Sequence, residues 1–596
     1  MIGKFFNQTP DFTGILKRFS LFSKNWERTR LNLARARNLP VLSLFGLLTG
    51  VLVGVIIIAF RLIIETSQSG FLPGGNPENY EALPPLERML ILISGSLVLG
   101  ILFFLVSRTP IRIGVLHVMD RLAYHEGHLP LRNAVMQFIG GALAIISGHS
   151  VGREGPCIHL GAATASIMGQ RLYLPNNSIR TLVACGVAAA IAASFNTPLA
   201  GVIFAMEVVI MEYTITGFTP VILSAVSATT MTRLVFDAEP VFRVPSFDLV
   251  SYWELPVIIF MGIFIGGLAA VFIRMVGWVT HHAQGYPVWL MMTLAGILVG
   301  MCAMVVPEVM GVGYDTVNAS IYGEIAVVSL LLILVFKLLA TAISVGMGIP
   351  AGLISPVIFI GAITGSLTGM LLSMLFTGVS PPGLYAMLGM GAMMGAALQA
   401  PLAGLLALLE LTANENLIFP GMLAIVSASL ASREMFRQKS IYLSQIQGIG
   451  MNFRNDPVAQ SLRRLAVGSV MNESFSIVKP VMQRHDTERI LADETPQWLV
   501  IFRDTGHLLL PATDLVRYIN ESEQDEINML EVPGKRLQLK PIRQQSTLQH
   551  AWEILTDTEN EAEALYVIRP ISAPGEIFGI ITMQDIEQSY RSINVE

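Results

Sequence analysis

Long apolar segments fill most of the chain between residues 41 and 432, separated by short polar stretches. The first segment is long enough to cross a membrane as a single helix of about 20 residues. Several others are too short, or too rich in glycine and proline, for a simple crossing. We expect these to form broken or re-entrant helices enclosed by protein. The segments are 41–66, 87–107, 134–147, 178–211, 219–235, 255–280, 287–306, 325–345, 353–377, 384–411 and 417–432.

The last 130 residues follow a different pattern. Short apolar runs at 498–502, 564–568 and 577–581 have the length and composition of strands, and an amphipathic, helix-like stretch lies between them at 547–555. The pattern predicts a small α/β domain over 465–596, joined to the apolar region by a linker at 446–464.

The distribution of charge supports this division. Charged residues make up 14% of the 596 residues, against about 25% in an average soluble protein. Residues 1–40 hold 10 charged side chains and residues 465–596 hold 32, so only 39 remain for the 424 residues between them. We therefore expect a polytopic α-helical membrane protein with a soluble tail, and the composition excludes fibrous, disordered and disulfide-scaffold classes. A net charge of −5 argues against nucleic acid as a partner.

The N-terminal arm, residues 1–40, is basic: it has eight Lys and Arg residues against two acidic ones. The positive-inside rule places this arm in the cytoplasm. If the acidic tail is also cytoplasmic, the number of full membrane crossings is even.

Two halves of the apolar region repeat each other. Gly152, Pro156, Gly161 and Ala162 recur 200 residues later, as Gly352, Pro356, Gly361 and Ala362. Gly186, the Pro-Leu-Ala-Gly segment 198–201 and Glu207 recur 203 residues later, as Gly389, 401–404 and Glu410. The preserved order favours two homologous halves, about 41–235 and 250–445, over a chance match of small residues. Repeats with broken helices are typical of transporters and channels that have a binding site near the membrane midplane.

The segment 152–156 carries the most telling chemistry. It places Arg153 and Glu154 in an apolar neighbourhood, where ionisable residues are costly and usually functional. The flanking glycines allow close approach of the backbone, and a helix start at the proline leaves N–H groups free for an anion. The alternative is a buried Arg–Glu pair that only braces two helices.

The segment 346–356 has the same design without a charge. Its glycines and prolines indicate a helix start that faces the core, and a helix N-terminus carries roughly half a positive charge. Such a terminus binds an anion without burial of a full cation. A hinge or a helix-packing motif is the alternative.

Other candidates are weaker. Each Pro-Leu-Ala-Gly segment indicates a tight contact between helices and is followed by one acidic residue, Glu207 or Glu410. The plain interpretation is that each acid lies at the cytoplasmic or the outer end of its helix. The three cysteines suggest neither a zinc site nor a disulfide framework. With no metal cluster, nucleophile triad or phosphate loop in the sequence, we do not expect an enzyme.

Together these motifs resemble the CLC family of chloride channels and chloride/proton exchangers. The resemblance rests on 152–156 followed by Gly161-Ala162, on 195–201, on 352–356 followed by Gly361-Ala362, and on 440–442. It covers about 41–445. It implies a homodimer in which each subunit has its own pore, built from two inverted repeats of tilted and broken helices. The implied location is a bacterial-type inner membrane with both termini in the cytoplasm. The implied partners are membrane lipid and chloride or another small anion, with protons as a possible further partner.

The resemblance also assigns roles to individual residues. Glu154 resembles the gating glutamate, whose carboxylate occupies an anion site until it is displaced or protonated. Gly152, Arg153 and Gly155 would surround it, and the N–H groups of Leu353 and Ile354 would face the anion. Tyr442 resembles the tyrosine whose hydroxyl caps the central site.

The sequence departs from the family pattern at two places. The usual Gly-Ser-Gly-Ile-Pro motif is absent, and its position corresponds to 112–116, where Ile113 replaces the serine that donates to the central anion. Exchangers usually have two adjacent glutamates after the first Pro-Leu-Ala-Gly segment, but here Glu207 is followed by Val208, which cannot carry a proton. On this ground we favour a passive anion channel gated by a glutamate, with a proton-coupled exchanger (an antiporter) as the alternative. Voltage gating is an expectation from the family resemblance alone.

The soluble tail resembles a pair of cystathionine-β-synthase (CBS) domains over about 465–592, with the end of one copy at 579–586 and a weaker copy at 509–515. The resemblance implies that Thr582 and Asp585 bind an adenine nucleotide, which would be the only cofactor. The alternative is a structural role in which Asp585 caps the next helix. A CBS-regulated membrane sensor without transport is a rival function for the whole chain.

Overall fold

The computed structural model describes residues 27–35, 38–106, 112–213, 215–236, 241–242, 244, 247–448, 457–503, 506–522, 524–557, 561–569 and 576–593. The chain forms two compact units. The helical unit comprises Ser43–Arg171 and Ile179–Arg454. The other, which we call the α/β unit, comprises Met1–Leu42, Leu172–Ser178 and Asn455–Glu596. The described part of the basic arm therefore belongs to the same unit as the C-terminal region. Residues 1–26 and 36–37 of the predicted arm lie outside the described residues. So do residues 449–456 of the predicted linker.

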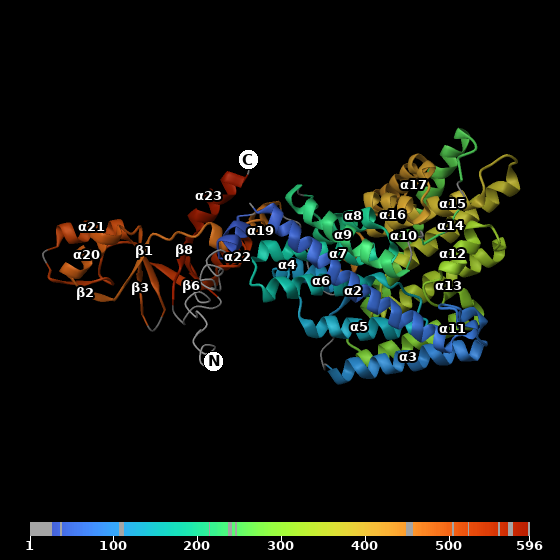
Figure 1. Cartoon of the computed structure of the whole chain (residues 1–596), viewed down its shortest axis with the longest axis horizontal. Helices are drawn as coiled ribbons and strands as arrows, with labels where there is room; N and C mark the ends of the chain where they lie inside the picture. The colour runs from blue at the N-terminus through green and yellow to red at the C-terminus, as the bar shows by residue number, and fades with distance from the viewer. Residues whose placement is uncertain are drawn as a thin grey trace, which may run out of the picture. The chain divides into compact units, whose positions relative to one another are not determined.

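The helical unit consists of long apolar helices and short broken ones (Figure 1). Nine helices within the described residues are long and apolar enough to span a membrane. The first half contains α2 (Leu39–Phe71), α3 (Pro85–Val106), α4 (Gly114–Tyr124), α5 (Leu131–Ile146), α6 (Glu154–Arg171), α7 (Asn176–Phe195), α8 (Pro198–Phe204) and α9 (Ile215–Phe236). The second contains α10 (Leu255–Ala283), α11 (Val288–Val305), α12 (Tyr314–Ile321), α13 (Val327–Gly346), α14 (Ile354–Leu375), α15 (Pro382–Leu398), α16 (Pro401–Thr412), α17 (Ile418–Leu430) and α18 (Ile441–Gly448).

The predicted apolar segments correspond closely to these helices, and the expected breaks fall at prolines. Pro198 and Pro401 occupy the first position of α8 and α16, where the missing N–H costs nothing because it would have no partner. The residues two before them, Asn196 and Gln399, both have a left-handed backbone, with φ of 58° and 54°. The sequence repeat is thus a repeat of backbone conformation.

Glycines set the packing within each half. A Cβ atom on Gly161 would lie 2.2 Å from the carbonyl oxygen of Gly186, and one on Gly361 would lie 2.3 Å from that of Gly389. No side chain fits at either contact, so α6 packs on α7 as α14 packs on α15. This confirms the two-repeat prediction.

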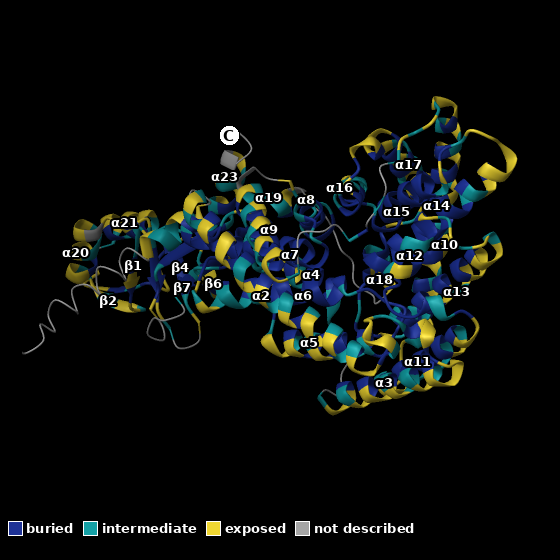
Figure 2. Cartoon of the chain, turned by 45° about the vertical axis from the view of Figure 1, so that its right-hand side comes forward, coloured by how far each residue is buried: buried dark blue, intermediate teal, exposed yellow. Residues whose placement is uncertain are grey.

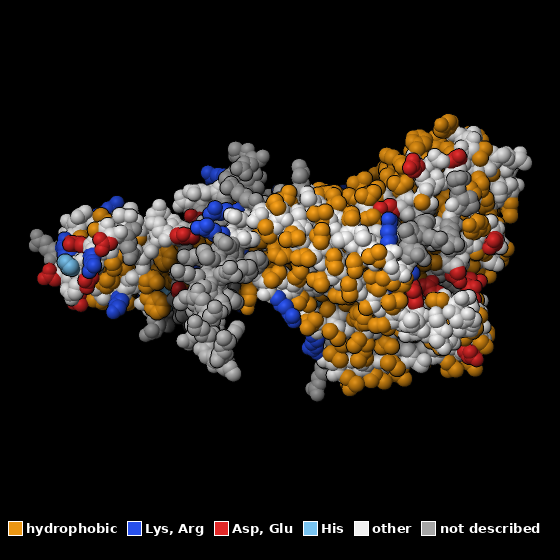
Figure 3. Space-filling view, viewed as in Figure 1, with side chains coloured by type: hydrophobic (Ala, Val, Ile, Leu, Met, Phe, Trp, Pro, Cys, Tyr) orange, Lys and Arg blue, Asp and Glu red, His pale blue; other side chains and the backbone are white. Residues whose placement is uncertain are grey.

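Burial separates the central helices from the peripheral ones. In Figure 2, α7 and α15 are almost wholly buried, whereas α3 and α11 show many exposed positions. Most of these exposed positions are apolar, for example Leu97, Phe104 and Met301. Hydrophobic side chains also cover most of the visible face of the helical unit in Figure 3. A surface of this kind suits lipid and not water.

In the α/β unit, two copies of one βαββα pattern follow each other. The first is β1 (Phe475–Val478), α20 (Arg484–Glu494), β3 (Trp498–Ile501), β4 (Leu508–Pro511) and α21 (Ala512–Glu521). The second is β6 (Leu537–Arg543), α22 (Leu548–Thr556), β7 (Ala564–Ile568), β8 (Gly579–Thr582) and α23 (Met583–Ile593). A short ribbon of β2 (Val481–Gln483) and β5 (Glu526–Asn528), the helix α19 (Pro457–Arg463) and a helix over 27–34 complete the unit.

The two copies share their strand pairing. β1 is parallel to β3, which is antiparallel to β4, and β6 is parallel to β7, which is antiparallel to β8. β4 and β6 join the copies into one six-stranded sheet. The predicted strands are confirmed, and the α/β region is compatible with a CBS pair.

Candidate anion site

The two repeated motifs meet at one point in the helical unit. Gly152 and Gly352 form an antiparallel bridge in which each N–H donates to the other's carbonyl, at 2.9 and 2.7 Å. α6 begins at Glu154 and α14 at Ile354, immediately after these glycines. The bridge therefore fixes two helix N-termini side by side.

The carboxylate of Glu154 lies between these two helix starts and is 1% exposed. Its Oε1 accepts hydrogen bonds from the backbone N–H of Ser355, at 3.1 Å, and from the Ser355 hydroxyl. Its Oε2 is buried without a hydrogen-bond partner among the described residues. A Cβ atom on Gly152 or Gly352 would lie 1.9 or 2.5 Å from Oε2, so only glycine leaves room for the carboxylate at both positions.

The surroundings of this carboxylate suit an anion. The N–H groups of Leu353 and Ile354 lie at the start of α14, where no intrahelical acceptor exists. The aligned dipoles of a helix add positive potential at such a start. The Glu154 carboxyl group therefore lies where backbone N–H groups and helix dipoles favour negative charge.

A hydroxyl chain leads away from Glu154. The Ser355 hydroxyl lies 3.0 Å from the Tyr314 hydroxyl, at the start of α12. The ring of Tyr314 lies 5.7 Å from the Arg153 guanidinium, which also donates to the Ser194 carbonyl at 3.0 Å. The sequence motifs assigned no role to Ser355 or Tyr314. Ser355 is the one hydroxyl residue between Gly346 and Pro356, and its place directly before that proline is a signal that could have indicated it.

The first cavity near Glu154, which we call the Arg153 cavity, has a volume of about 380 Å³. Arg153 and Tyr314 line it, as do Arg61, Glu65 and Glu78. Glu78 belongs to the loop before α3, and desolvation raises the pKa of its carboxyl, opposed by the charge of Arg153. The cavity thus combines cations with an acid that holds its proton more tightly than usual.

The second, which we call the Tyr442 cavity, has a volume of about 280 Å³. Ile113, Leu353 and Tyr442 line it, so the structure brings together three residues that the sequence analysis placed at one anion site. Ile113 immediately precedes α4 and has no donor to offer. The Tyr442 hydroxyl is buried without a partner among the described residues. Gly155 is not among the residues that line this cavity. It packs against Ala351, which does line it, and the Ala351 carbonyl oxygen would lie 2.5 Å from a Cβ on Gly155.

The two acids after the Pro-Leu-Ala-Gly segments cap helices of the opposite half. The Glu207 carboxylate accepts hydrogen bonds from the backbone N–H groups of Leu402 and Ala403, in the first turn of α16, at 3.3 and 2.8 Å. Glu410 does the same for the first turn of α8, at 3.0 and 2.8 Å. Val208 is buried in the π-helical turn Ala205–Ile210. Each acid thus has a structural function, which the sequence pattern did not indicate.

In the α/β unit, Thr582 directly precedes α23, and Asp585 lies in the first turn of that helix, where its side chain satisfies the helix start. The Asp585 Oδ2 accepts hydrogen bonds from both the backbone N–H and the hydroxyl of Thr582, at 2.8 and 2.7 Å. This is the structural alternative named for these residues. A nucleotide ribose would have to share or displace the contact.

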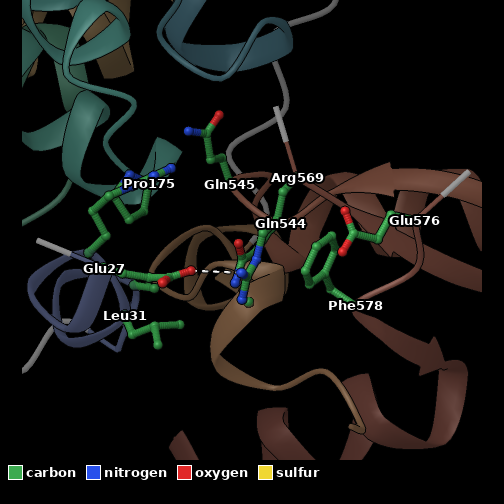
Figure 4. Close-up of a pocket in the computed structure, with 11 residues that line it drawn as sticks. Glu27, Leu31, Pro175, Gln544, Gln545, Arg569, Glu576 and Phe578 are labelled. Carbon is green, nitrogen blue, oxygen red and sulfur yellow. Dashed lines mark ion pairs between the residues drawn. The ribbon is translucent and has the colours of Figure 1, made fainter. Parts of the chain in front are cut away.

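A separate cavity of about 360 Å³ lies at the other end of β8 (Figure 4). Arg569 pairs with Glu27 at 2.7 Å and lies 4.0 Å above the Phe578 ring. Burial lowers the pKa of Arg30, which lines the same cavity, and the nearby Arg569 lowers it further while Glu27 raises it. Among the described residues, no cluster of three or more His, Cys, Asp or Glu could hold a metal.

Comparison with known proteins identifies the helical unit. The family model described as "Voltage gated chloride channel" matches residues 95–433. A protein of Ralstonia nicotianae named "Putative chloride channel protein ClcB-like" is 33% identical over 58% of this chain and 82% of its own length. A protein of Vibrio cholerae named "H(+)/Cl(-) exchange transporter ClcA" is 29% identical over 49% of this chain and 65% of its own length.

A solved structure shares the fold over most of the chain. It is titled "Crystal Structure of a eukaryotic CLC transporter" and has a TM-score of 0.59 at 20% identity. The match covers 91% of this chain and 97% of that one. Because the family model covers more than half of the chain and falls on both repeats, this protein is an integral membrane protein that belongs to the CLC family of anion transport proteins.

Proposed function

We propose that this protein exchanges chloride for protons across the membrane, with Glu154 as the group that serves both ions. The observation that carries the proposal is the buried Glu154 carboxylate, held at the starts of α6 and α14, with one oxygen that has no hydrogen-bond partner in the described part of the chain. A carboxylate in such a place competes with an anion when charged, and it carries a proton when neutral.

The chemistry follows from the geometry. A deprotonated Glu154 is attracted to the helix starts and blocks the path between the Arg153 cavity and the Tyr442 cavity. Protonation removes the charge that holds it there, so a chloride ion takes its place at the same N–H groups. Return of the carboxylate releases the proton and the anion, which couples their movements.

Relatives favour the exchanger over the passive channel that Val208 suggested. The Vibrio cholerae relative is named as an H⁺/Cl⁻ exchanger. The passive channel remains the second candidate, since Val208 cannot carry a proton and the Ralstonia relative is named as a putative chloride channel. If exchange occurs, the proton reaches Glu154 by a route that avoids Val208.

Three further features belong to the proposal. The basic arm and the α/β unit lie in the cytoplasm of a bacterial cell, since eight positive charges precede the first span. The working protein is a homodimer. An adenine nucleotide binds at Thr582 and Asp585 of the CBS-like pair.

The experiment is a simultaneous record of chloride and proton movement in vesicles that hold the purified chain. A chloride gradient that drives uphill proton movement is the expected result. Chloride movement without protons would establish the passive channel instead. The absence of both would favour a sensor without transport.

A further inference from the structure

Gln137 is a buried polar residue to which neither the motifs nor the comparisons assign a role. It lies on α5 and is 0% exposed. Both its Nε2 and its Oε1 are buried without a hydrogen-bond partner among the described residues. Native interiors rarely leave a buried amide unsatisfied, because its lost hydrogen bonds to water are not replaced.

The Gln137 side chain lines the Tyr442 cavity, and two other buried polar groups that line this cavity also lack a hydrogen-bond partner among the described residues. The hydroxyls of Thr280, on α10, and of Tyr442, on α18, are also buried without partners among the described residues. Three separate helices therefore bring three unsatisfied donors to one cavity. A set of this kind indicates a ligand that accepts hydrogen bonds.

The charges around the cavity indicate the sign of that ligand. Among the described residues that line it there is no carboxylate, and the one charged side chain is that of Arg112, which also pairs with Asp120 at 3.7 Å. Leu353, at the start of α14, also lines it and adds an N–H group without an intrahelical acceptor. A small anion would accept hydrogen bonds from these groups, and the guanidinium of Arg112 and the helix start favour it over a cation.

We propose that the Gln137 amide is an anion ligand of the Tyr442 cavity, acting with the Thr280 and Tyr442 hydroxyls in place of the donor that Ile113 lacks. The inference rests on the proposed function, since it adds a specific ligand to the transport pathway. Nε2 donates to the bound anion, so Gln137 contributes to anion affinity. The position next to the α4 start fits this role, since a Cβ on Gly114 would lie 3.9 Å from Gln137 Oε1.

The test is chloride binding to the purified full-length chain by calorimetry, combined with thermal unfolding with and without chloride. Gln137→Leu keeps the approximate volume and removes the amide. We expect a fivefold to thirtyfold loss of chloride affinity and a smaller rise of Tm on addition of chloride. Without chloride, the Tm of Gln137→Leu should equal or exceed that of the wild type, because an unsatisfied group has been removed.

Gln170→Leu is the matched control. Gln170 lies on α6, and its Nε2 already donates to the Ser166 hydroxyl at 2.8 Å, so this variant should lower Tm and keep the wild-type chloride affinity. Gln137→Glu places a like charge at the site and should abolish binding at neutral pH.

The outcomes separate the two proposals. Wild-type chloride binding with an unchanged affinity in Gln137→Leu would overturn the assignment of Gln137 alone. A wild type that binds neither chloride, nitrate nor fluoride would overturn the proposed function, and this inference with it. A Gln137→Leu variant that unfolds more readily in the absence of chloride would indicate a packing role instead.

Discussion

Gly152 and Gly352, 200 residues apart, pair through two reciprocal backbone hydrogen bonds. This pairing joins the two halves at their repeated motifs and brings Glu154 of the first half against Ser355 of the second. Helix starts from both repeats thus converge on one carboxylate, which neither half could hold alone.

Glu154→Gln should raise chloride flux several-fold and remove its coupling to protons. The amide has no negative charge to compete with the anion and cannot exchange a proton at neutral pH. Chloride-selective electrode and pH records from the same vesicles would measure both effects. Wild-type flux with intact coupling would show that Glu154 is not the gate.

Ile113→Ser should increase chloride affinity, by about tenfold if the new hydroxyl makes one hydrogen bond of about 1.5 kcal/mol to the anion. Ile113 lines the Tyr442 cavity directly before α4, so a serine there would add a donor at the pathway. Calorimetric titration of the variant gives the result. Ile113→Val serves as the control that changes size without adding a donor, and equal affinities in all three proteins would refute the placement.

Ser355→Ala should loosen the closed gate. The serine hydroxyl donates to the charged Glu154 carboxylate, and hydrogen bonds to charged groups contribute about 1.5–3 kcal/mol. Anion flux should therefore rise by about tenfold to a hundredfold if opening limits the rate. Tyr314→Phe removes only the second hydroxyl of the chain and should have a smaller effect. In a Glu154→Gln background the Ser355→Ala effect should shrink, because the acceptor has lost its charge.

Glu207→Gln and Glu410→Gln form a symmetric pair. Each carboxylate caps a helix of the other half, so each variant should lower stability by about 1 kcal/mol. If Glu207 only caps α16, the two variants will have the same, nearly unchanged ratio of chloride to protons. A change of that ratio in Glu207→Gln alone would place Glu207 on a proton pathway, as the family resemblance implied.

The pH dependence of stability should depend on Glu81, in the loop before α3. Desolvation raises the pKa of its carboxyl to about 7, with further contributions from Asp315 and Glu308. The pKa of this carboxyl in the unfolded chain is 4.5. Between pH 4.5 and about pH 7, the unfolded chain has therefore released the proton, whereas the folded protein still retains it. The folded protein should therefore lose stability as the pH rises through that window.

Thermal unfolding at pH 5 and pH 8 would measure this loss. Glu81→Gln should reduce the difference in Tm between the two values. Glu87→Gln, at an exposed position in the first turn of α3, changes the same charge and should leave the difference as it is. Equal differences in both variants would exclude Glu81 as the group responsible.

The sequence by itself determined the class of protein and the repeat. Apolar segments of membrane-spanning length, with charge concentrated towards the two ends of the chain, indicate a polytopic membrane protein, because a bilayer accepts few charges and no unsatisfied backbone groups. The motifs 152–156 and 346–356 predicted helix starts, and α6 and α14 begin there, each two residues before the proline. Strand-like runs likewise located β3, β7 and β8, since short apolar runs bounded by polar turns fit buried strands.

Only the tertiary structure decided which groups meet. The contact of Glu154 with Ser355, the crossed caps of Glu207 and Glu410, and the unsatisfied Gln137 beside Tyr442 all join residues from different helices. Local periodicity carries no information about such pairs, because it records which face of a helix is apolar and not what that face touches. The charge and hydrogen bonding of a buried side chain depend on those neighbours, and the chemistry of the site depends on them in turn.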